Sequence, residues 1–493
     1  FMVAFGFSIG LMMFIKKLKI ENFKGYHGED NELEFNIPDG ETEGSGLNIF
    51  VGENNAGKST VFEIIDFIKD GTKKNIEDLI CKSDSANIAE KLSAELTFTG
   101  NLSEVIAAHV QANKVAAFTS HVFEDEGVNY FRVKRCSEVG EKKILFWNGN
   151  EFVNPSGIDA PFKKFYDNNF IWADTNPSNE AKFGSTTICG SLLKEIALGH
   201  IETDEYRAFS EQYHRVFNHP ESELRQKISL VENQVREVFS SQFGMADISF
   251  IFEELQVENF FKTISIMIDD GVNVPMGEKG HGMQRALALS LLQVYAEITC
   301  NAHGAGISKP FYLFIDEPEI CLHPSGQQKL LEALMIISKS RQVFVTTHSP
   351  FLLSSPYLKN VGLFVFKKEN NKNVVERADT SPWFPWSPSW GEINFKAYNL
   401  ATVELHNELY GYLQERNSCP NERAMEQWLS SQGIVLSKVW TKEIRNVAQA
   451  PTNTTLQTFI RNHIHHPENV TMQSNRYTQQ ELLSSIQQMV GLL

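Results

Sequence analysis

The sequence predicts an α/β fold: a head built on a buried parallel sheet, an inserted helical arm, and a C-terminal α-helical bundle. Three runs, Leu47 to Val51, Phe311 to Ile315 and Gln342 to Val345, are predominantly apolar, which is typical of strands buried on both faces. Each run leads into a polar segment. Between about Gly100 and Phe250 the chain instead contains a long amphipathic segment, Glu221 to Phe243, which predicts a helix.

The expected domain organisation follows from these segments and from the length of 493 residues, which suits two to four units. The predicted parts are an apolar N-terminal extension (1–13), an N-terminal lobe of the head (14–100), an inserted arm or helical lobe (101–245), a second lobe of the head (246–370), a linker rich in Trp and Pro (371–398) and a helical C-terminal domain (399–493). The extension is shorter than the roughly 20 residues that span a bilayer, so we expect no membrane anchor.

Charge and cysteine usage narrow the function classes. The net charge of −16 opposes non-specific binding to nucleic acids, because phosphate contacts require Lys and Arg. The densest basic stretch lies between Lys16 and Lys24, and we expect a solvated strand edge there. The six cysteines are scattered without a metal-binding spacing, which favours free thiols in a reducing, cytoplasmic compartment.

A glycine-rich segment follows the first apolar run and leads into the apolar-periodic segment VFEIIDFI, so strand, loop and helix follow one another. Glycines allow successive backbone N–H groups to curl around phosphate oxygens at a helix N-terminus, which favours anions. Lys58 is expected to reach the β- and γ-phosphates of ATP, and Ser59 to supply a hydroxyl to Mg²⁺. The predicted nucleotide-binding residues of this loop are Gly52, Asn54, Asn55, Gly57, Lys58, Ser59 and Thr60.

Acidic and imidazole side chains follow the other two apolar runs. Asp316 and Glu317 open the sequence Asp-Glu-Pro-Glu directly after the run that ends at Ile315. We expect Asp316 to hold Mg²⁺ and Glu317 to orient and deprotonate the water that attacks the γ-phosphate. His348 follows the third run and is expected to contact the γ-phosphate. These three residues are the predicted catalytic set.

A second glycine segment lies between these motifs. Gly280, Gly282 and Gln284 belong to the segment GEKGHGMQR, which opens the helical run ALALSLLQVYAEI and predicts a second anion site. One chain has no need of two phosphate sites for one nucleotide. We therefore expect a homodimer, or a higher homo-oligomer, in which the glycine loop of one copy closes on the ATP held by Lys58 of the other.

These motifs, in this order, resemble the ABC-type ATPase heads of the RecF, SMC and OLD (overcoming lysogenization defect) group. Ile15 to Tyr26 (IKKLKIENFKGY) resembles the strand with which those proteins begin. The resemblance is closest to OLD-type ATPases, because the signature reads GxGxQR and the acidic strand end reads DEPExxLHP, and it covers residues from about 14 to 365. It implies an ABC-type P-loop NTPase head that uses ATP and Mg²⁺. Gly280 stands where transporter-type signatures carry serine, and no Q-loop glutamine is evident.

OLD nucleases continue into a TOPRIM nuclease domain, marked by a glutamate at a VEG-like strand end and by a later DxD pair. We find neither pattern in the C-terminal third of this chain. The resemblance therefore implies an ATPase subunit like those of the Septu or PARIS antiphage systems, which act with a separate effector nuclease.

The linker carries three tryptophans, Trp383, Trp386 and Trp390. Such side chains stack on bases or anchor a partner in some proteins. We favour the interpretation that they pin the linker to the head.

A short motif near the C-terminus suggests a second activity. Arg461 and His466 lie in FIRNHIHHPEN, which resembles the R-[NHD]-x(4–6)-H motif of HEPN ribonucleases, with a spacer one residue shorter. Pro467 moves His466 out of the helical region, to the helix end about one turn from Arg461. A ribonuclease site at Arg461 and His466 competes with a structural or partner-binding bundle, which we favour. A polar site with Glu404 and Glu408 and a zinc site from His463, His465 and His466 are further alternatives.

Together the motifs predict a homodimeric regulatory ATPase that controls a partner effector, in prokaryotic antiphage defence. Two alternatives stay open. One is a self-contained HEPN-type ribonuclease toxin gated by the ATPase. The other is a RecF-like DNA-repair ATPase, which the net charge disfavours.

Overall fold

The computed structural model divides the chain into two units. The described residues are 12–71, 75–82, 91–138, 143–173, 203–243, 246, 249–250, 252, 266–301, 309–320, 322–353, 356–378, 382–445 and 447–493. The first unit joins residues 1–173 to 305–493, and the second comprises residues 174–304. Most of the predicted N-terminal extension lies outside the described residues.

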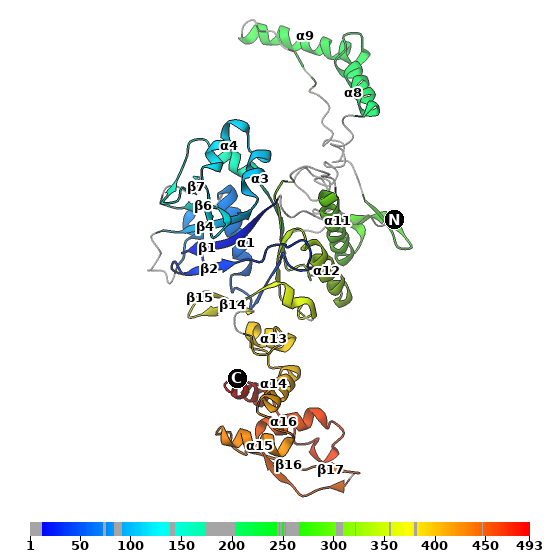
Figure 1. Ribbon diagram of the computed structural model, residues 1–493. Helices are drawn as coiled ribbons and strands as arrows, with labels where there is room; N and C mark the ends of the chain where they lie inside the picture. Colours follow the sequence, from blue (N-terminus) through cyan, green and yellow to red (C-terminus); the bar gives the residue numbers. More distant parts are fainter. Residues whose placement is uncertain are drawn as a thin grey trace. The chain divides into compact units, whose positions relative to one another are not determined.

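A largely parallel sheet forms the centre of the first unit (Figure 1). Within the described residues its strand order is β15 (Lys372–Arg377), β14 (Gly362–Glu369), β3 (Leu47–Gly52), β13 (Gln342–Thr347), β12 (Phe311–Asp316) and β9 (Asp167–Ile171), and β15 alone of these runs antiparallel. β3 and β13 are buried at every position. The three apolar runs are therefore neighbouring strands, as predicted, and their carboxyl ends meet at one edge.

A second, antiparallel sheet packs over the first helix of the head. Its strands are β2 (Asn31–Glu34), β1 (Met13–Glu21), β4 (Ser93–Gly100), β6 (Val128–Cys136), β7 (Leu145–Trp147) and β8 (Phe152–Val153), with β5 (Val122–Asp125) paired to β6. Helix α1 (Lys58–Asp70) packs against both sheets within one hydrophobic core cluster. Its apolar residues therefore occupy most of its circumference. Phe62, for example, contacts Phe314 of the parallel sheet, with ring centroids 5.2 Å apart.

Arg135 on β6 ties the antiparallel sheet to the end of α1. Its side chain is fully buried, with Nε donating to the carbonyl of Ile68 (3.0 Å) and Nη2 to that of Lys69 (3.2 Å). The last carbonyls of a helix lack partners within the helix and carry partial negative charge. The guanidinium therefore satisfies and neutralises this helix end.

Removing this guanidinium is expected to destabilise the head. Arg135→Met keeps the aliphatic stem but leaves buried carbonyls without their donor, which costs about 3 kcal/mol of unfolding free energy. Denaturant unfolding measures this loss. The exposed Arg423 provides the control, since Arg423→Met should change stability by less than about 0.5 kcal/mol. Equal midpoints for the two variants would contradict this role for Arg135.

The predicted arm at 101–245 was too wide. Residues from 102 to 171 supply the helices α3 (Leu102–His109), α4 (Ala112–Thr119) and α5 (Asp159–Phe165), and the strands β5 to β9, which belong to the two sheets of the head. Apart from β6 these strands are short, and several carry polar residues, so no continuous apolar run marks them. In the second unit the described elements are α8 (Asp204–Phe217), α9 (Glu223–Phe243), β10 (Met267–Asp269), β11 (Asn273–Pro275), η2 (Met276–Glu278) and α11 (His281–Asn301). The long helix predicted to end at Phe243 is α9.

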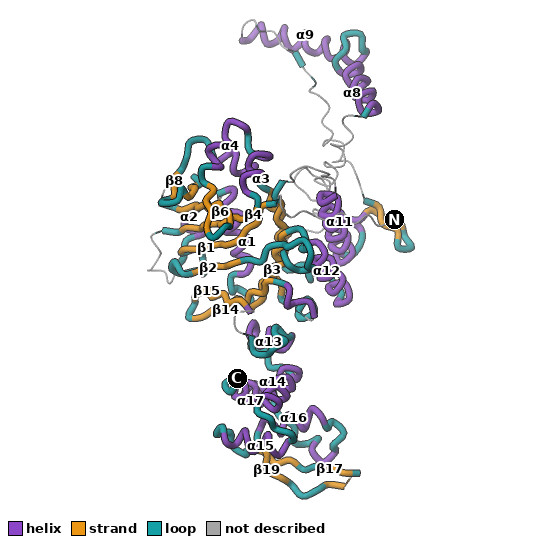
Figure 2. The backbone as a smooth tube through the Cα atoms, viewed as in Figure 1, coloured by secondary structure: helices purple, strands orange, loops and turns teal. Residues whose placement is uncertain are grey.

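The C-terminal lobe is mainly helical, with short strand pairs that the sequence did not predict (Figure 2). Its elements are α13 (Trp390–Tyr398), α14 (Val403–Arg416), α15 (Glu422–Ser431), β16 (Lys438–Trp440), β17 (Glu443–Ile444), β18 (Val447–Ala448), β19 (Thr452–Thr454), α16 (Leu456–His465), η5 (Val470–Met472) and α17 (Gln479–Val490). The linker is shorter than the predicted range of 371–398. The strand β15 occupies the start of that range, and the helix α13 occupies its end.

Three remaining elements belong to the head: α2 (Ile76–Leu79), α12 (Pro324–Ile337) and η3 (Pro356–Asn360).

Cys81, Cys136 and Cys419 are buried free thiols, as expected. In the described part of the chain, no helix combines the length and apolarity needed to cross a membrane.

Candidate active site

The glycine loop connects β3 to α1 in a tightly curled conformation. Gly57 has φ +95°, a left-handed value that glycine adopts without strain. A Cβ atom at this position would lie 2.3 Å from Nδ2 of Asn373 and 2.9 Å from the hydroxyl of Tyr26. The Tyr26 hydroxyl also donates to the carbonyl of Gly57 (2.9 Å). The side chains of Tyr26 and Asn373 therefore pack against the glycine loop. The sequence analysis marked neither residue as functional.

Lys58 lies across this loop. Its side chain is almost fully buried, and Nζ donates to the carbonyls of Gly52 (3.0 Å) and Glu53 (2.9 Å). Burial lowers the pKa of Lys58 to about 8, although the nearby carboxylates of Glu317 and Asp316 oppose this shift. The structure therefore holds a buried lysine in the first turn of α1, with its Nζ on the carbonyls of the glycine loop.

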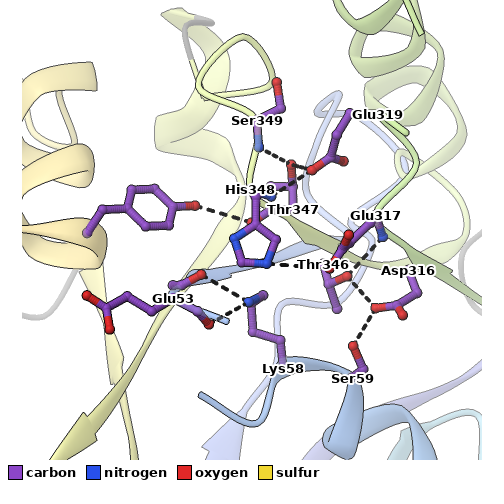
Figure 3. A network of polar contacts seen from close by, with 12 residues as sticks. Glu53, Lys58, Ser59, Asp316, Glu317, Glu319, Thr346, Thr347, His348 and Ser349 are labelled. Atoms are coloured by element: carbon purple, nitrogen blue, oxygen red, sulfur yellow. Dashed lines mark hydrogen bonds and ion pairs between the residues drawn. The ribbon is translucent and has the colours of Figure 1, made fainter. Parts of the chain in front are cut away.

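Asp316, at the end of β12, meets the loop through Ser59 (Figure 3). Ser59 Oγ donates to Asp316 Oδ1 (2.7 Å), and Thr346 Oγ1 of β13 donates to the same oxygen (2.6 Å). A serine hydroxyl and a carboxylate are oxygen ligands of the kind that Mg²⁺ takes in phosphate sites, where substrate phosphates and waters complete the shell. These two residues therefore fit the predicted metal. When bound, Mg²⁺ neutralises charge on the phosphates.

Glu317 and His348 face one another at the ends of neighbouring strands. The backbone N–H of Glu317 donates to Thr346 Oγ1 (3.0 Å), which fixes the left-handed residue (φ +46°) that follows Asp316. His348 Nε2 lies 3.4 Å from Glu317 Oε1, and both side chains are about 30% exposed. Burial, and secondly Lys58, lower the pKa of His348, so its imidazole is neutral at pH 7. A partly accessible carboxylate held in this way is suited to accept a proton from water.

Glu319 is a site residue that the sequence analysis missed. Its Oε1 accepts hydrogen bonds from the backbone N–H of His348 (2.7 Å) and from Thr347 Oγ1 (2.9 Å). Burial raises the pKa of this carboxyl. Glu319 thus positions the His348 backbone from the turn that begins with Asp316. The second Glu of Asp-Glu-Pro-Glu was the available signal, but its partner lies 29 residues away in the sequence.

The structure brings Lys58, Ser59, Asp316, Glu317 and His348 together at one sheet edge. Their roles stay predictions. In the same loop, Asn54 and Asn55 are exposed and Thr60 is half-buried in the first turn of α1.

The second glycine segment lies in the other unit. The helix α11 begins at His281, and the space around a Cβ at Gly280 is open among the described atoms; Gly282 lies in the first turn. Gln284 is buried, and its side-chain amide donates to the carbonyls of Gly277 (3.2 Å) and Lys279 (2.6 Å). Gln284 therefore shapes the loop before the helix.

The C-terminal motif is placed at a helix end, as expected. His466 follows the last residue of α16, is 44% exposed, and approaches Glu468 (3.2 Å). Arg461, one turn earlier, donates to Asn462 Oδ1 (2.9 Å) and lies 3.6 Å from Glu422 Oε2. The guanidinium of Arg461 therefore contacts polar side chains of the C-terminal lobe itself.

The alternative of a zinc site loses its support. His463 packs against Phe459, with ring centroids 4.5 Å apart, and its Nε2 contacts the carbonyl of Asn475 (2.8 Å). Among the described side chains, which include His465 and His466, no group of three or more potential metal-binding residues gathers. His463 is a packing residue.

Of the other candidate residues of the lobe, Glu404 is exposed, whereas Glu408 and the three tryptophans make contacts within the protein. Glu408 accepts a hydrogen bond from Ser389 (2.6 Å), and burial raises the pKa of Glu408. Trp383 and Trp386 pack on the C-terminal lobe rather than on the head, which corrects that expectation. Trp390 alone of the three contacts the head, through Nε1 and the carbonyl of Pro350 (3.0 Å).

Comparison with known proteins identifies the head. Residues 13–145 and 162–353 match the AAA ATPase domain family. The chain belongs to this family. It is 26% identical to the Old nuclease of Escherichia phage P2 over 327 residues, which cover 63% of the chain and 54% of that protein. It is 22% identical to endonuclease GajA of Bacillus cereus (strain HuB5-5) over 458 residues, covering 74% of the chain and 63% of GajA.

A third relative is the DNA double-strand break repair Rad50 ATPase of Thermoplasma acidophilum, 30% identical over 146 residues that cover 29% of the chain and 15% of Rad50. The predicted resemblance to the OLD group of ABC-type ATPases is thus confirmed. The chain spans less than two thirds of the length of these relatives.

The buried Lys58 of this ATPase domain leads to a pH prediction. The protonated ammonium attracts phosphate, and its pKa of about 8 means that the charge is lost as the pH rises through 8. We therefore expect kcat/KM for ATP, which reports the free enzyme, to level off about one pH unit below this pKa and to fall up to tenfold per pH unit above it. Steady-state hydrolysis between pH 7 and 10 measures this, with unfolding curves to show that the fold persists. A profile that stays flat to pH 10 would mean that Lys58 keeps an ordinary pKa.

Proposed function

We propose that this chain is a cytoplasmic regulatory ATPase that dimerises around ATP and controls a partner effector in prokaryotic antiphage defence. The observation that carries the proposal is the continuous set of contacts from Ser59 through Asp316 and Thr346 to Glu317 and His348. These contacts support Ser59 and Asp316 as the pair that holds the metal and Glu317 as the base, at one edge of the sheet. The buried Lys58 lies in the same site. Membership of the AAA ATPase domain family and similarity to the Old nuclease and GajA support the same function.

The hydrolytic roles follow from these positions. Lys58 and the N-terminus of α1 bind the phosphates, and Ser59 and Asp316 hold Mg²⁺. Glu317 accepts the proton of the attacking water, while neutral His348 donates a hydrogen bond from beside it. Glu319 holds the backbone of His348, and Thr346 holds the backbone of Glu317, so both groups are positioned by hydrogen bonds.

Two features support self-association. The open space at Gly280, at the start of α11, suits the phosphate of a nucleotide held by a second copy. In addition, α9 carries exposed apolar side chains at Leu224, Val231, Val235 and Val238, which follow one another at intervals of seven, four and three residues and so share one helix face. Such a stripe is typical of a helix that packs against another helix.

A separate effector fits better than the two alternatives. The engagement of Arg461 by Glu422 and Asn462 disfavours the ribonuclease. The basic strand also offers little to DNA, because Lys16 and Lys17 pair with Glu34 and Glu32, each at 2.7 Å, and Lys24 pairs with Glu63.

Phage challenge of cells tests the proposal. Cells that express the chain with the product of its neighbouring gene should survive infection, and Lys58→Ala should abolish the protection. Arg461→Ala/His466→Ala should protect as well as the wild type. Protection that survives Lys58→Ala would contradict an ATP-controlled role, and loss of protection in the double variant would favour the ribonuclease.

A further inference from the structure

The segment from Thr347, the last residue of β13, to Pro350 carries His348 and makes hydrogen bonds with two other parts of the chain; we call it the switch segment. Glu319 holds it from the side of β12 through the His348 N–H and the Thr347 hydroxyl. From the opposite side, the first helix of the C-terminal lobe reaches it. Tyr398 donates its hydroxyl to the carbonyl of Thr347 (3.3 Å), and Trp390 donates Nε1 to the carbonyl of Pro350 (3.0 Å). Both ends of α13 are therefore bonded to the switch segment.

Tyr398 also links the switch segment to the glycine loop. Its hydroxyl interacts with the backbone of Gly52, where β3 ends, as well as with Thr347, where β13 ends. Its ring lies 6.3 Å from the His348 ring. Burial raises the pKa of Tyr398, so the hydroxyl stays protonated at any physiological pH. One side chain from the C-terminal lobe thus bridges two strand ends of the ATP site.

The same helix is fastened to the lobe behind it. Ser389 caps α13 and donates its hydroxyl to Glu408 of α14 (2.6 Å). A Cβ at Gly391 would lie 2.8 to 3.0 Å from Cβ, Cα and N of Leu405, so the two helices approach too closely for any side chain there. A shift of α14 therefore moves α13, and with it Tyr398.

We propose that α13 couples the ATP site to the C-terminal lobe, with Tyr398 as a positioning residue for His348. The proposal rests on the proposed function, because it assigns a route by which the hydrolytic site is regulated. The backbone of His348 belongs to the switch segment, and the carbonyls of Thr347 and Pro350 in that segment accept the hydrogen bonds from α13. The lobe thereby sets the alignment of His348 with Glu317, and a partner bound to the lobe acts on hydrolysis through these contacts.

Tyr398→Phe tests the contact directly, because it removes one hydroxyl and keeps the ring. We expect kcat for ATP to fall about fivefold, as for the loss of a single aligned hydrogen bond, while KM changes less than twofold. Tyr412→Phe, in the same lobe, is the matched control and should hydrolyse ATP as the wild type does. A purely structural contribution of the Tyr398 ring would leave kcat of Tyr398→Phe unchanged.

Gly391→Ala tests the coupling from the lobe, away from the strand ends. The added methyl forces α13 and α14 apart, and kcat should fall by a similar factor. Gly411→Ala is its control, since the space beside Gly411 on α14 is open. If Gly391→Ala fails to fold, hydrogen exchange decides: ATP should slow exchange in 390–398 of the wild type, and Tyr398→Phe should cancel this effect.

The two proposals fail in different ways. If the wild-type chain neither hydrolyses ATP nor associates with it, the proposed function is wrong. If the wild type does both, but Tyr398→Phe retains the wild-type kcat and the ATP-dependent exchange of 390–398, the coupling through α13 is overturned.

Discussion

Lys58→Ala is expected to lose ATP binding while the protein stays folded. The ammonium is the buried cation of the site, and without it Asp316 and Glu317 repel the incoming phosphates without compensation. A charged hydrogen-bonding group in such surroundings contributes about 4 kcal/mol, so Kd should rise about a thousandfold. Calorimetric titration with Mg²⁺ and ATP measures the change.

Lys163→Ala is the matched control for this variant. Lys163 Nζ contacts the carbonyl of Asp70 (2.8 Å), at the far end of α1 from the glycine loop, and its exposed side chain is remote from the phosphates. Its loss should leave Kd unchanged. If Lys58→Ala binds ATP within threefold of the wild type, the assignment of the glycine loop as the phosphate site is wrong.

Glu317→Gln should reduce kcat by two to four orders of magnitude while ATP binding is preserved or strengthened. The amide keeps the shape of the side chain and its place beside His348, but it cannot accept a proton from water. Removing one negative charge near the phosphates also favours the bound state. Phosphate release in single-turnover experiments separates this chemical step from binding.

Glu332→Gln, on the exposed face of α12, controls for the loss of one carboxylate and should hydrolyse ATP normally. A Glu317→Gln protein with kcat within threefold of the wild type would remove Glu317 from the chemistry. His348 would then be the next candidate for the base.

The strands and loop of the ATP site were predictable because their signals are local. The residues from Leu47 to Ser59 specify strand, curled loop and helix within one short stretch, and a bare acidic pair after a buried strand indicates a cation or a donor. The helical character of residues 399–493 was also predictable, although α13 was taken as part of the linker, and Pro467 marked the end of α16 correctly.

The residues that hold the site in place could not be predicted, because their partners lie far away in the sequence. Glu319 reaches His348 across 29 residues, and Tyr398 reaches Thr347 across 51. The strands β5 to β9 were missed because no continuous apolar run marks them, and their pairing partners in the two sheets of the head are not evident from a local pattern in these strands.

The most direct test of the central claim is the mass of Glu317→Gln in solution with Mg²⁺ and ATP. A nucleotide sandwich that cannot hydrolyse ATP cannot reopen, so light scattering should show twice the mass of the ATP-free state, or a higher multiple if dimers assemble further. The doubled mass should disappear in Lys58→Ala/Glu317→Gln. A Glu317→Gln protein that binds ATP yet keeps the mass of one chain would contradict the account.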